Sequence, residues 1–453
     1  MSPDTIAAIA TPPGRGAIGV VRVSGPAAQQ VATVLAGNVP PPRIARLATF
    51  RNQDGEALDE GIVLFFAGPA SYTGEDCLEL QGHGGSAVLA QILEAVLACG
   101  VRLAQPGEFT RRAFRHGKLN LAQAEAVADL IQASTPQAAL AAARSLHGVF
   151  SEAIYEMAEM LTEIRSIVEA YIDFAEDMGD EMGAMGDARA MVEALRGRLE
   201  GVLSQARLGR ALAEGLQVVL VGEPNAGKSS LFNLLSGEEA AIVTAMPGTT
   251  RDALLRQVQL DGLMVHLTDT AGLAAASKDP IEALGMEKTK TTCLNADLLL
   301  AVASDEQTFQ LQQEMIRRLL QDLGITVPVL WVRNKIDLTG SPPAIQEHEG
   351  GSVVYCSALS GAGMELLRQA IKDHLIHGSE NAEAPFAARR RHVESLTQVH
   401  ASLQAAGHFL THGPLELAAE QLRQAQMELG EIVGESSNED LLDHIFSSFC
   451  IGK

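Results

Sequence analysis

The segment Val218–Ser230 places a glycine-rich loop between an apolar run and a helical pattern, and such a loop can bind phosphate. The loop reads GEPNAGKS from Gly222 to Ser229 and fits G-x-x-x-x-G-K-[ST]. Its glycines let main-chain N–H groups approach a phosphate, and the following helix adds partial positive charge. Lys228 would reach the outer phosphates and Ser229 would ligate Mg²⁺. The flanking patterns disfavour a chance glycine-rich turn.

Three later segments, each at the end of an apolar run, indicate which nucleotide binds. Asp269-Thr270-Ala271-Gly272 follows Leu263–Leu267; its carboxylate suits the water shell of Mg²⁺ and the N–H of Gly272 suits a γ-phosphate. The carboxyl ends of strands are where open α/β sheets bind ligands. This spacing predicts a phosphate- and magnesium-binding edge.

The segment NKID, from Asn334 to Asp337, predicts selectivity for guanine. A carboxylate only accepts hydrogen bonds, so Asp337 suits the N1–H and N2–H₂ donors of guanine. Adenine lacks this paired donor edge. The stem of Lys335 can pack on the base. The main chain at Ser357-Ala358 can meet the guanine O6 atom. Four residues alone indicate only a polar turn, but the order of the motifs indicates a GTPase.

The motifs resemble those of the translation-factor-related branch of P-loop GTPases. The loop IVTAMPGTTRD from Ile242 to Asp252 matches its switch I, where the residue matching Thr250 closes on Mg²⁺. An asparagine at Asn225 followed by G-T-T-R-D is similar to the potassium-activated subclass. That likeness places K⁺ among Asn225, Thr244, Met246 and Thr249, although T-A-M-P-G departs from the usual loop. It implies nucleotide contacts from Asn225, Ala226, Gly227, Lys228, Ser229, Ser230, Thr244, Ala245, Met246, Pro247, Gly248, Thr249, Thr250, Asp269, Thr270, Ala271, Gly272, Asn334, Lys335, Asp337, Ser357, Ala358 and Leu359.

Composition bounds the rest of the chain. A length of 453 residues suggests about three domains, and 47% hydrophobic with 4% aromatic residues favours Ala/Leu/Val-rich helical cores. Five scattered cysteines fit a reducing cytoplasm, and we expect no leader or membrane span. The net charge of −22 disfavours membranes and DNA as partners. RNA contact would need local basic clusters such as Arg111–Lys118 or Arg389–His392, which alone more often are solvated surface.

The order of patterns predicts a multidomain chain. Residues 1–117 indicate an α+β domain with short strands and one helix, Ser86–Cys99. Residues 118–215 indicate long helices, 216–376 alternate strand and helix as an α/β GTPase domain, and 377–453 return to helices. Within the GTPase, Ser341–Gly351 is expected to be a polar loop. The simplest account is an all-α helical domain split by an inserted α/β P-loop GTPase domain, since domain insertion is tolerated where termini lie close together.

Segments outside the GTPase resemble one family across the whole chain. They are YTGED from Tyr72, ELQGHGG from Glu79 and the final LLDHIFSSFCIGK, Leu441–Lys453, joined by ATPPGRG from Ala10 and PGEFT from Pro106. This pattern is similar to the MnmE (TrmE) family of tRNA modification GTPases. The resemblance implies an N-terminal, folate-binding and dimerising domain that takes a 5-formyltetrahydrofolate-type donor. It also implies an FAD-dependent MnmG partner and a carboxymethylaminomethyl or aminomethyl group at C5 of the tRNA wobble uridine, U34.

The resemblance assigns the folate contacts to Arg22, Glu79, Lys118 and Lys453. A carboxylate such as Glu79 is a paired acceptor for the amide-plus-amine edge of a pterin, and Arg or Lys suits folate's anionic tail. Spacing alone would make each of the four a surface charge or, for Lys453, a frayed end.

The residue after the D-T-A-G motif, Leu273, cannot orient an attacking water as the glutamine of Ras-type GTPases does. K⁺ could then stabilise the negative charge of the transition state. The resemblance assigns water orientation to Glu282, which on its own would be an exposed helical glutamate.

Cys450 has three possible roles. The ending C-I-G-K superficially meets a prenylation pattern, but Gly452 and Lys453 fit it poorly. A structural thiol is the second reading, and a catalytic nucleophile at uridine C6 is the third.

Two rival functions are a regulatory GTPase in ribosome assembly and a folate-dependent aminomethyltransferase with a regulatory GTPase. Mass analysis of wobble uridines after gene removal separates these readings, because intact modification favours the ribosomal one.

Overall fold

The computed structural model describes most of the chain and divides it into two compact units. The described residues are 4–173, 182–222, 225–237, 255–260, 263–269, 292, 296–304, 306–323, 327–348, 351–375, 385–435 and 438–453. The first unit comprises Met1–Ile131, Ser145–Glu200 and Glu394–Lys453, and the second comprises Gln132–Arg144 and Gly201–Val393. Among the described residues no helix is both long and apolar enough to cross a membrane.

The first unit contains a sheet whose described strands are largely antiparallel. In spatial order they are β3 (Arg46–Arg51), β4 (Ala57–Phe66), β5 (Cys77–Gly84), β2 (Gly16–Ser24), β1 (Ile6–Ile9) and β6 (Arg102–Leu103). Only β1 and β6 pair in parallel. In β5 the buried Leu78 and Leu80 alternate with half-buried Glu79 and Gln81, as expected for a strand with one covered face.

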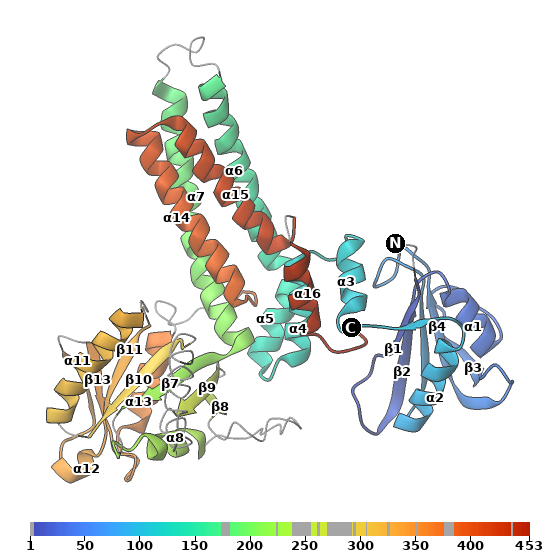
Figure 1. The fold of residues 1–453 in the computed structure, drawn as a ribbon, viewed down its shortest axis with the longest axis horizontal. Coiled ribbons are helices and arrows are strands. Elements are labelled where there is room, and N and C mark those ends of the chain that lie inside the picture. Colours follow the sequence, from blue (N-terminus) through green and yellow to red (C-terminus); the bar gives the residue numbers. More distant parts are fainter. Residues whose placement is uncertain are drawn as a thin grey trace. The chain divides into compact units, whose positions relative to one another are not determined.

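Two helices, α1 (Ala28–Ala36) and α2 (Ser86–Leu97), cover one face of this sheet (Figure 1). Val31, Leu35 and Ile92 pack there against Leu78 and Leu80. The prediction of a single helix in this region is wrong, because α1 and α3 (Glu108–Arg115) are also helical. Both are short, so each offers too few turns for a clear helical periodicity.

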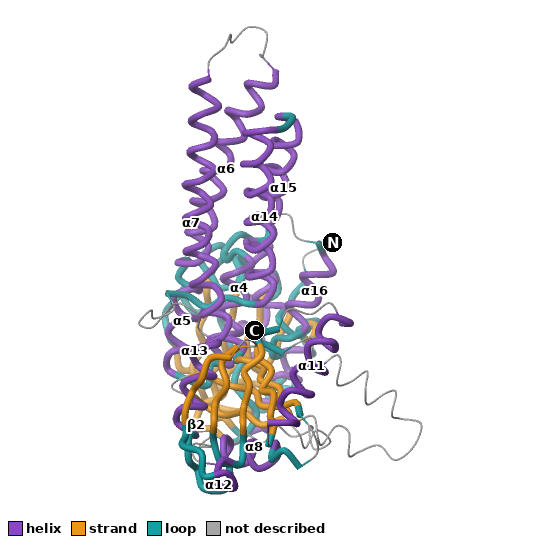
Figure 2. Tube along the Cα trace, turned by 90° about the vertical axis from the view of Figure 1, so that its left-hand side faces the viewer, coloured by secondary structure: helices purple, strands orange, loops and turns teal. Residues whose placement is uncertain are grey.

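Long helices make up the rest of the first unit and continue into the second. They are α4 (Leu121–Gln132), α5 (Pro136–Leu146), α6 (Val149–Asp173), α7 (Met182–Glu214), α14 (Arg390–His412), α15 (Leu415–Val433) and α16 (Glu439–Ser447). Figures 1 and 2 show α6, α7, α14 and α15 side by side. α15 packs along α6, and Arg165 on α6 hydrogen-bonds Gln426 on α15. Helices that precede and follow the second unit's sheet therefore pack together.

The second unit holds a mixed sheet. Its described strands, in spatial order, are β12 (Ala344–His348), β13 (Gly351–Tyr355), β11 (Val329–Arg333), β10 (Leu298–Ala303), β7 (Leu216–Val221), β9 (Leu263–Asp269) and β8 (Leu255–Leu260). The central strands are parallel, and β8 and β12 pair antiparallel at the edges. The expectation of a loop over Ser341–Gly351 is therefore wrong: β12 is an edge strand whose exposed polar side chains hide its pattern.

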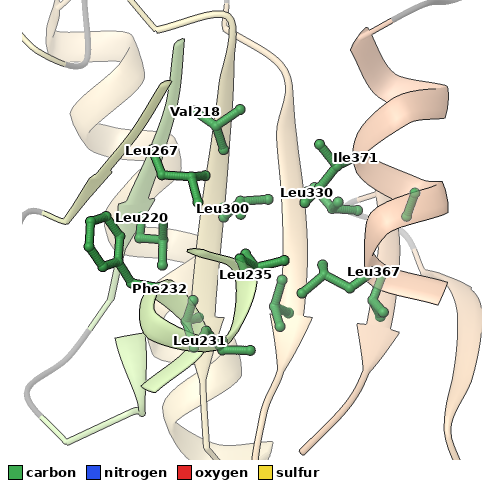
Figure 3. Packing of buried hydrophobic residues seen from close by; sticks show 14 of the residues in the cluster. Val218, Leu220, Leu231, Phe232, Leu235, Leu267, Leu300, Leu330, Leu367 and Ile371 are labelled. Atoms are coloured by element: carbon green, nitrogen blue, oxygen red, sulfur yellow. The ribbon is translucent and has the colours of Figure 1, made fainter. Parts of the chain in front are cut away.

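Helices cover both faces of this sheet. Leu231 and Leu235 of α8 (Lys228–Gly237) and Leu367 and Ile371 of α13 (Met364–Leu375) pack on one face, as Figure 3 shows. They meet the inward residues Val218, Leu220, Leu267, Leu300 and Leu330. Phe309 and Ile316 of α11 (Glu306–Leu323) pack on the other face against Trp331. Burial on both faces explains the continuous apolar runs of β7, β10 and β11.

Candidate functional site

The glycine-rich loop after β7 folds back on itself and then enters α8. Gly227 has a φ of 95°, and a Cβ atom there would lie 2.1 Å from Nδ2 of Asn334, so only glycine fits. Lys228 is 5% exposed, and its Nζ donates to the main-chain oxygen of Gly222 at 2.7 Å. The lysine ammonium is thus held across the loop that the sequence predicts to bind phosphate.

Asn334 connects this loop to the loop after β13. Its Nδ2 donates to the main-chain oxygen of Ala226 at 3.0 Å, and its Oδ1 accepts from the main-chain nitrogen of Ala358 at 2.9 Å. The residue is 2% exposed. Because both ends of the amide are engaged, Asn334 fixes the spacing between two segments that are far apart in the sequence.

Lys335 and Asn225 form a second connection at the surface. Lys335 Nζ donates to the main-chain oxygen of Asn225 at 2.6 Å. Both residues have left-handed backbones, with φ of 65° and 64°, which asparagine tolerates better than most residues. The stem of Lys335 is predicted to pack on a base, and in the structure its ammonium ties the segment predicted to bind the base to the loop predicted to bind phosphate.

Asp337 is exposed at the start of the short helix α12 (Ile336–Thr339), and the buried Ser357 donates a hydrogen bond from Oγ to its Oδ1. This bond orients the carboxylate while leaving oxygen lone pairs for a ligand. An oriented acceptor of this kind suits the paired N–H donors of guanine. The neighbouring Leu359 is 87% exposed.

The structure brings together the predicted nucleotide residues that it describes in the loops after β7, β11 and β13. Ser229 and Ser230 are exposed on the first turn of α8. Asp269 ends β9 and pairs in register with Leu220 of β7, so its segment follows a strand beside the phosphate-binding loop. The predicted residues Thr244, Ala245, Met246, Pro247, Gly248, Thr249, Thr250, Thr270, Ala271, Gly272 and Glu282 lie outside the described residues.

A second polar cluster lies in the first unit, where Arg22 of β2 faces Glu79 of β5. The two residues are register partners, and Nε and Nη2 of Arg22 donate to Oε1 of Glu79 at 3.1 and 2.9 Å. Gln81 donates to the other carboxylate oxygen at 3.2 Å. The side chains of Arg22 and Glu79 are 19% and 18% exposed, so this charged pair remains accessible to a ligand.

Two aromatic rings flank this pair. The guanidinium carbon of Arg22 lies 5.5 Å from the ring centre of Tyr72 and 5.9 Å from that of Phe109, within range of cation–π attraction. Phe109 is fully buried and supports Arg22 from within the core, whereas Tyr72 is half-buried; sequence reasoning singled out neither ring. Their only sequence signal is their place in the YTGED and PGEFT segments, which served solely to indicate the family.

Lys453 joins the Arg22–Glu79 pair from the far end of the sequence. Burial lowers the pKa of its ammonium, and the charge of Arg22 lowers it further, whereas Glu79 and Cys450 raise it. The main-chain oxygen of Lys453 accepts from the N–H of Phe109 at 3.2 Å. Three of the four predicted folate residues are therefore within electrostatic reach of one another.

Lys118 is the fourth predicted folate residue and lies differently. Its Nζ donates to the main-chain oxygen of Pro69 at 3.1 Å, and it makes no hydrogen bond or ion pair with Arg22, Glu79 or Lys453 within the described part of the chain. Cys450 is exposed, and its main-chain oxygen accepts from the N–H of Lys453 at 3.3 Å. Its thiol is thus accessible beside the cluster.

The basic cluster on α3 is compensated by acidic side chains. Arg111 pairs with Glu439 and Asp443 at 2.5 and 2.7 Å. Arg112 pairs with Asp4, Glu75 and Glu108 at 2.6, 3.0 and 3.0 Å, and Arg115 pairs with Glu439 at 3.0 Å. The arginines of this segment are therefore paired with acidic side chains, and they do not form an uncompensated basic surface.

Comparison with known proteins assigns both regions to one kind of protein. Residues 5–118 match the model of the GTP-binding protein TrmE N-terminus, and residues 121–450 match that of the MnmE helical domain. The chain is 50% identical to the tRNA modification GTPase MnmE of Nitrosococcus oceani over 99% of this chain and 97% of the relative. It is 48% identical to the protein of the same name from Nitrosomonas europaea over the full length of both.

One solved structure that resembles the chain is a putative nucleolar GTP-binding protein 1 from Plasmodium falciparum. It shares 18% identity and covers 35% of this chain and 85% of its own, with a TM-score of 0.26. That score is too low to support a conclusion about the fold.

Proposed function

The chain belongs to the MnmE family of tRNA modification GTPases, and we propose that it couples potassium-activated GTP hydrolysis to folate-dependent modification of the wobble uridine. It is a GTP hydrolase that acts in tRNA modification. The single observation that carries the folate part is the convergence of Lys453 on the Arg22–Glu79 pair. Nothing in GTP hydrolysis requires such a cluster in a separate unit.

The nucleotide half of the proposal uses the loops after β7, β11 and β13. The main chain of Asn225–Ser229 would cradle the phosphates, with Lys228 neutralising their charge. The oriented carboxylate of Asp337 would read guanine. Mg²⁺ would be held by Ser229 and Thr250, and it would supply charge neutralisation at the phosphates. Glycine at Gly227 lets the Asn334 side chain pack directly against this loop.

Potassium would bind beside the phosphates, with Asn225, Thr244, Met246 and Thr249 as its ligands. Asn225 fits this role because the residue is exposed to solvent in the loop that follows β7. K⁺ would provide positive charge that other GTPases obtain from an arginine. Glu282 would orient the attacking water in place of the glutamine that Leu273 replaces.

The folate half of the proposal uses the open face of the first sheet. Glu79 would accept from the amide-plus-amine edge of a pterin, the half-buried Tyr72 offers a flat surface beside it, and Arg22 with Lys453 would attract folate's carboxylates. Lys118 would contact a more distant part of the ligand, since it bonds to Pro69 instead of to the cluster. Cys450 remains a predicted nucleophile. Normal modification of the wobble uridine by a Cys450→Ser variant would contradict that role.

The remaining proposals concern partners and communication. We propose a cytoplasmic homodimer that works with an FAD-dependent MnmG partner to place a carboxymethylaminomethyl or aminomethyl group at C5 of U34. Helices α7 and α14 each run without interruption from one unit into the other. Continuous helices transmit displacement, which supports a relay of the nucleotide state toward the folate cluster.

The test is reconstitution with a labelled one-carbon unit. Full-length protein, MnmG and tRNA carrying unmodified U34 are incubated with GTP, Mg²⁺, K⁺ and a tetrahydrofolate carrying a ¹³C one-carbon group. Nucleosides are then analysed by mass spectrometry. We expect ¹³C in the C5 substituent of U34. Modified U34 without the label would contradict the folate part of the proposal and leave the GTPase assignment intact.

A further inference from the structure

We propose that Gly452 is a positioning residue: by letting the segment Cys450–Lys453 lie directly on β1, it places Lys453 at the Arg22–Glu79 pair. The inference rests on the proposed folate function and adds a requirement to it. The folate site would be complete only while this segment is docked on the sheet.

The first observation is the close approach at Gly452. Its φ is 99°, a backbone conformation that disfavours any residue with a Cβ atom. A Cβ atom there would lie 2.5 Å from the main-chain oxygen of Ile9 and 3.0 Å from Cα of Ala10. Both atoms belong to the main chain at the end of β1, so they cannot move aside as a flexible side chain would. Alanine would therefore lift the segment.

The second observation is a glycine at the start of α3 that lies close to the end of α16, just before the segment. Gly107 has a φ of 66°, and a Cβ atom there would lie 2.6 Å from the main-chain oxygen of Phe446. The N–H of Gly107 donates to the oxygen of Cys450 at 3.5 Å. Glycines from two distant parts of the sequence thus allow close approach, Gly452 of the segment to β1 and Gly107 of α3 to the end of α16 that carries the segment.

The third observation is that main-chain groups of the segment satisfy the start of α3. No side chain caps this helix, and the first N–H groups of a helix have no partner within it. The oxygen of Lys453 accepts from the N–H of Phe109 at 3.2 Å. Lys453 is therefore fixed by its own main chain, while its ammonium lies within electrostatic reach of Arg22 and Glu79.

The segment is anchored at its other end by aromatic packing. Phe446 and Phe449 are buried with Leu121, Ala124 and Ile445, and their ring centres lie 5.5 Å apart. Only three residues separate the buried Phe449 from Lys453. Because the buried Phe449 is so near, the few residues between it and Lys453 have little freedom to rearrange. A small displacement at Gly452 must therefore move Lys453.

The experiment measures binding of 5-formyltetrahydrofolate to the full-length protein by isothermal titration calorimetry. The variants are Gly452→Ala, Gly107→Ala, Lys453→Ala and the double variant Gly452→Ala/Lys453→Ala. Gly100→Ala is the matched control, because Gly100 has a similar left-handed φ of 82° with no atom within 4 Å of its Cβ position. Thermal unfolding and GTP hydrolysis are measured on every variant to confirm folding.

We expect Gly452→Ala and Lys453→Ala each to weaken binding roughly tenfold or more, the value of a lost hydrogen bond to a charged group. The double variant should bind no more weakly than Lys453→Ala, since both changes remove the same contact. Gly107→Ala should also weaken folate binding. This variant keeps the proposal testable if Gly452→Ala does not fold. Gly100→Ala should bind within about twofold of wild type, because a substitution without contacts has little effect.

Three outcomes would overturn the inference. Unchanged binding by a folded Gly452→Ala would overturn it while leaving the folate proposal in place. A double variant whose loss is the product of the two single losses would show that Gly452 acts independently of Lys453. Wild-type protein that does not bind the folate would overturn the folate proposal itself and the positioning role with it.

Discussion

The side-chain amide of Asn334 donates to the main-chain oxygen of Ala226 at 3.0 Å, so a residue of the base-recognition motif also holds the phosphate-binding loop. Its other end accepts from Ala358. The loops that we propose to bind phosphate and base are therefore joined by one buried side chain, and a change at Asn334 should disturb both.

Asn334→Ala should leave the oxygen of Ala226 and the N–H of Ala358 without these partners. We expect a loss of about 1–3 kcal/mol in the free energy of unfolding and at least a roughly tenfold weaker affinity for GTP. Urea denaturation and competition with a fluorescent guanine nucleotide measure the two effects. Asn233→Ala, at an exposed position on α8, is the control and should change neither. Wild-type affinity in Asn334→Ala would contradict the bridging role.

Potassium should accelerate GTP turnover over sodium at equal ionic strength if Asn225 helps to hold the ion. Asn225→Gly removes the side chain while retaining a residue suited to its φ of 64°, because glycine adopts this conformation without strain. The variant should therefore keep GTP binding and lose most of the difference between the two salts. Phosphate release is measured in KCl and NaCl. Equal rates of GTP turnover by wild type in the two salts would contradict the role of potassium in hydrolysis.

The ion pairs of Arg112 should contribute strongly to the stability of the first unit. Its side chain is 12% exposed and it pairs with Glu75 and Glu108, which are 16% and 14% exposed. Removing one member of such a group leaves buried charge without a partner, so Arg112→Met should cost about 3 kcal/mol. Arg115→Met, in a pair whose members are 52% and 65% exposed, should cost under about 1 kcal/mol. Urea unfolding compares the two variants, and equal costs would contradict this account.

Acid should weaken the same group of ion pairs. Burial alone would raise the pKa of Glu108, but hydrogen bonds from Arg102, Gln105 and Arg112 hold it below its usual value. A carboxyl group with a lowered folded-state pKa stabilises the fold above its unfolded pKa, and that stability disappears as the pH falls through the folded-state pKa. Arg112→Met removes one of the hydrogen bonds that lower the pKa of Glu108, so the variant should lose less stability than wild type on acidification, as urea unfolding at a series of pH values would show. Coincident pH profiles would contradict this expectation.

Several features of the chain were predictable from the sequence because their signals are local. The loop from Gly222 to Ser229, the NKID motif and the helix Leu415–Val433 are each encoded by adjacent residues, and the structure confirms their placement. Three of the four residues that the resemblance assigns to folate also lie within electrostatic reach of one another, and their role in folate binding stays a prediction.

Other features depend on contacts between distant residues. The residues next to Arg111 and Arg115 in the sequence give no sign that Glu439 pairs with both arginines. The sequence therefore indicates a basic surface at this segment. Likewise, Gly452 needs to be glycine because of Ile9, which lies at the opposite end of the sequence. The edge strand β12 was missed because its exposed polar residues lack the alternation that identifies a half-buried strand.

Folate binding should be linked to proton uptake through Lys453. Burial lowers the pKa of this ammonium, Arg22 lowers it further, and Glu79 and Cys450 partly oppose the shift. An anionic ligand favours the charged lysine, so affinity should fall as the pH rises through the lowered pKa, and binding there should take up protons. Calorimetry at alkaline pH in buffers of different ionisation enthalpy measures this uptake. Equal uptake by Lys453→Met would show that another group titrates.

The most direct test of the whole account compares wild type with Lys228→Ala in the labelled one-carbon reaction. Lys228 lies in the second unit, so the variant should bind 5-formyltetrahydrofolate as wild type does while losing GTP hydrolysis. If hydrolysis drives the folate-dependent step, ¹³C incorporation into U34 should fall at least roughly a hundredfold, the effect of losing a charge that stabilises the transition state. Incorporation by Lys228→Ala at the wild-type rate would contradict the coupling of GTP hydrolysis to tRNA modification.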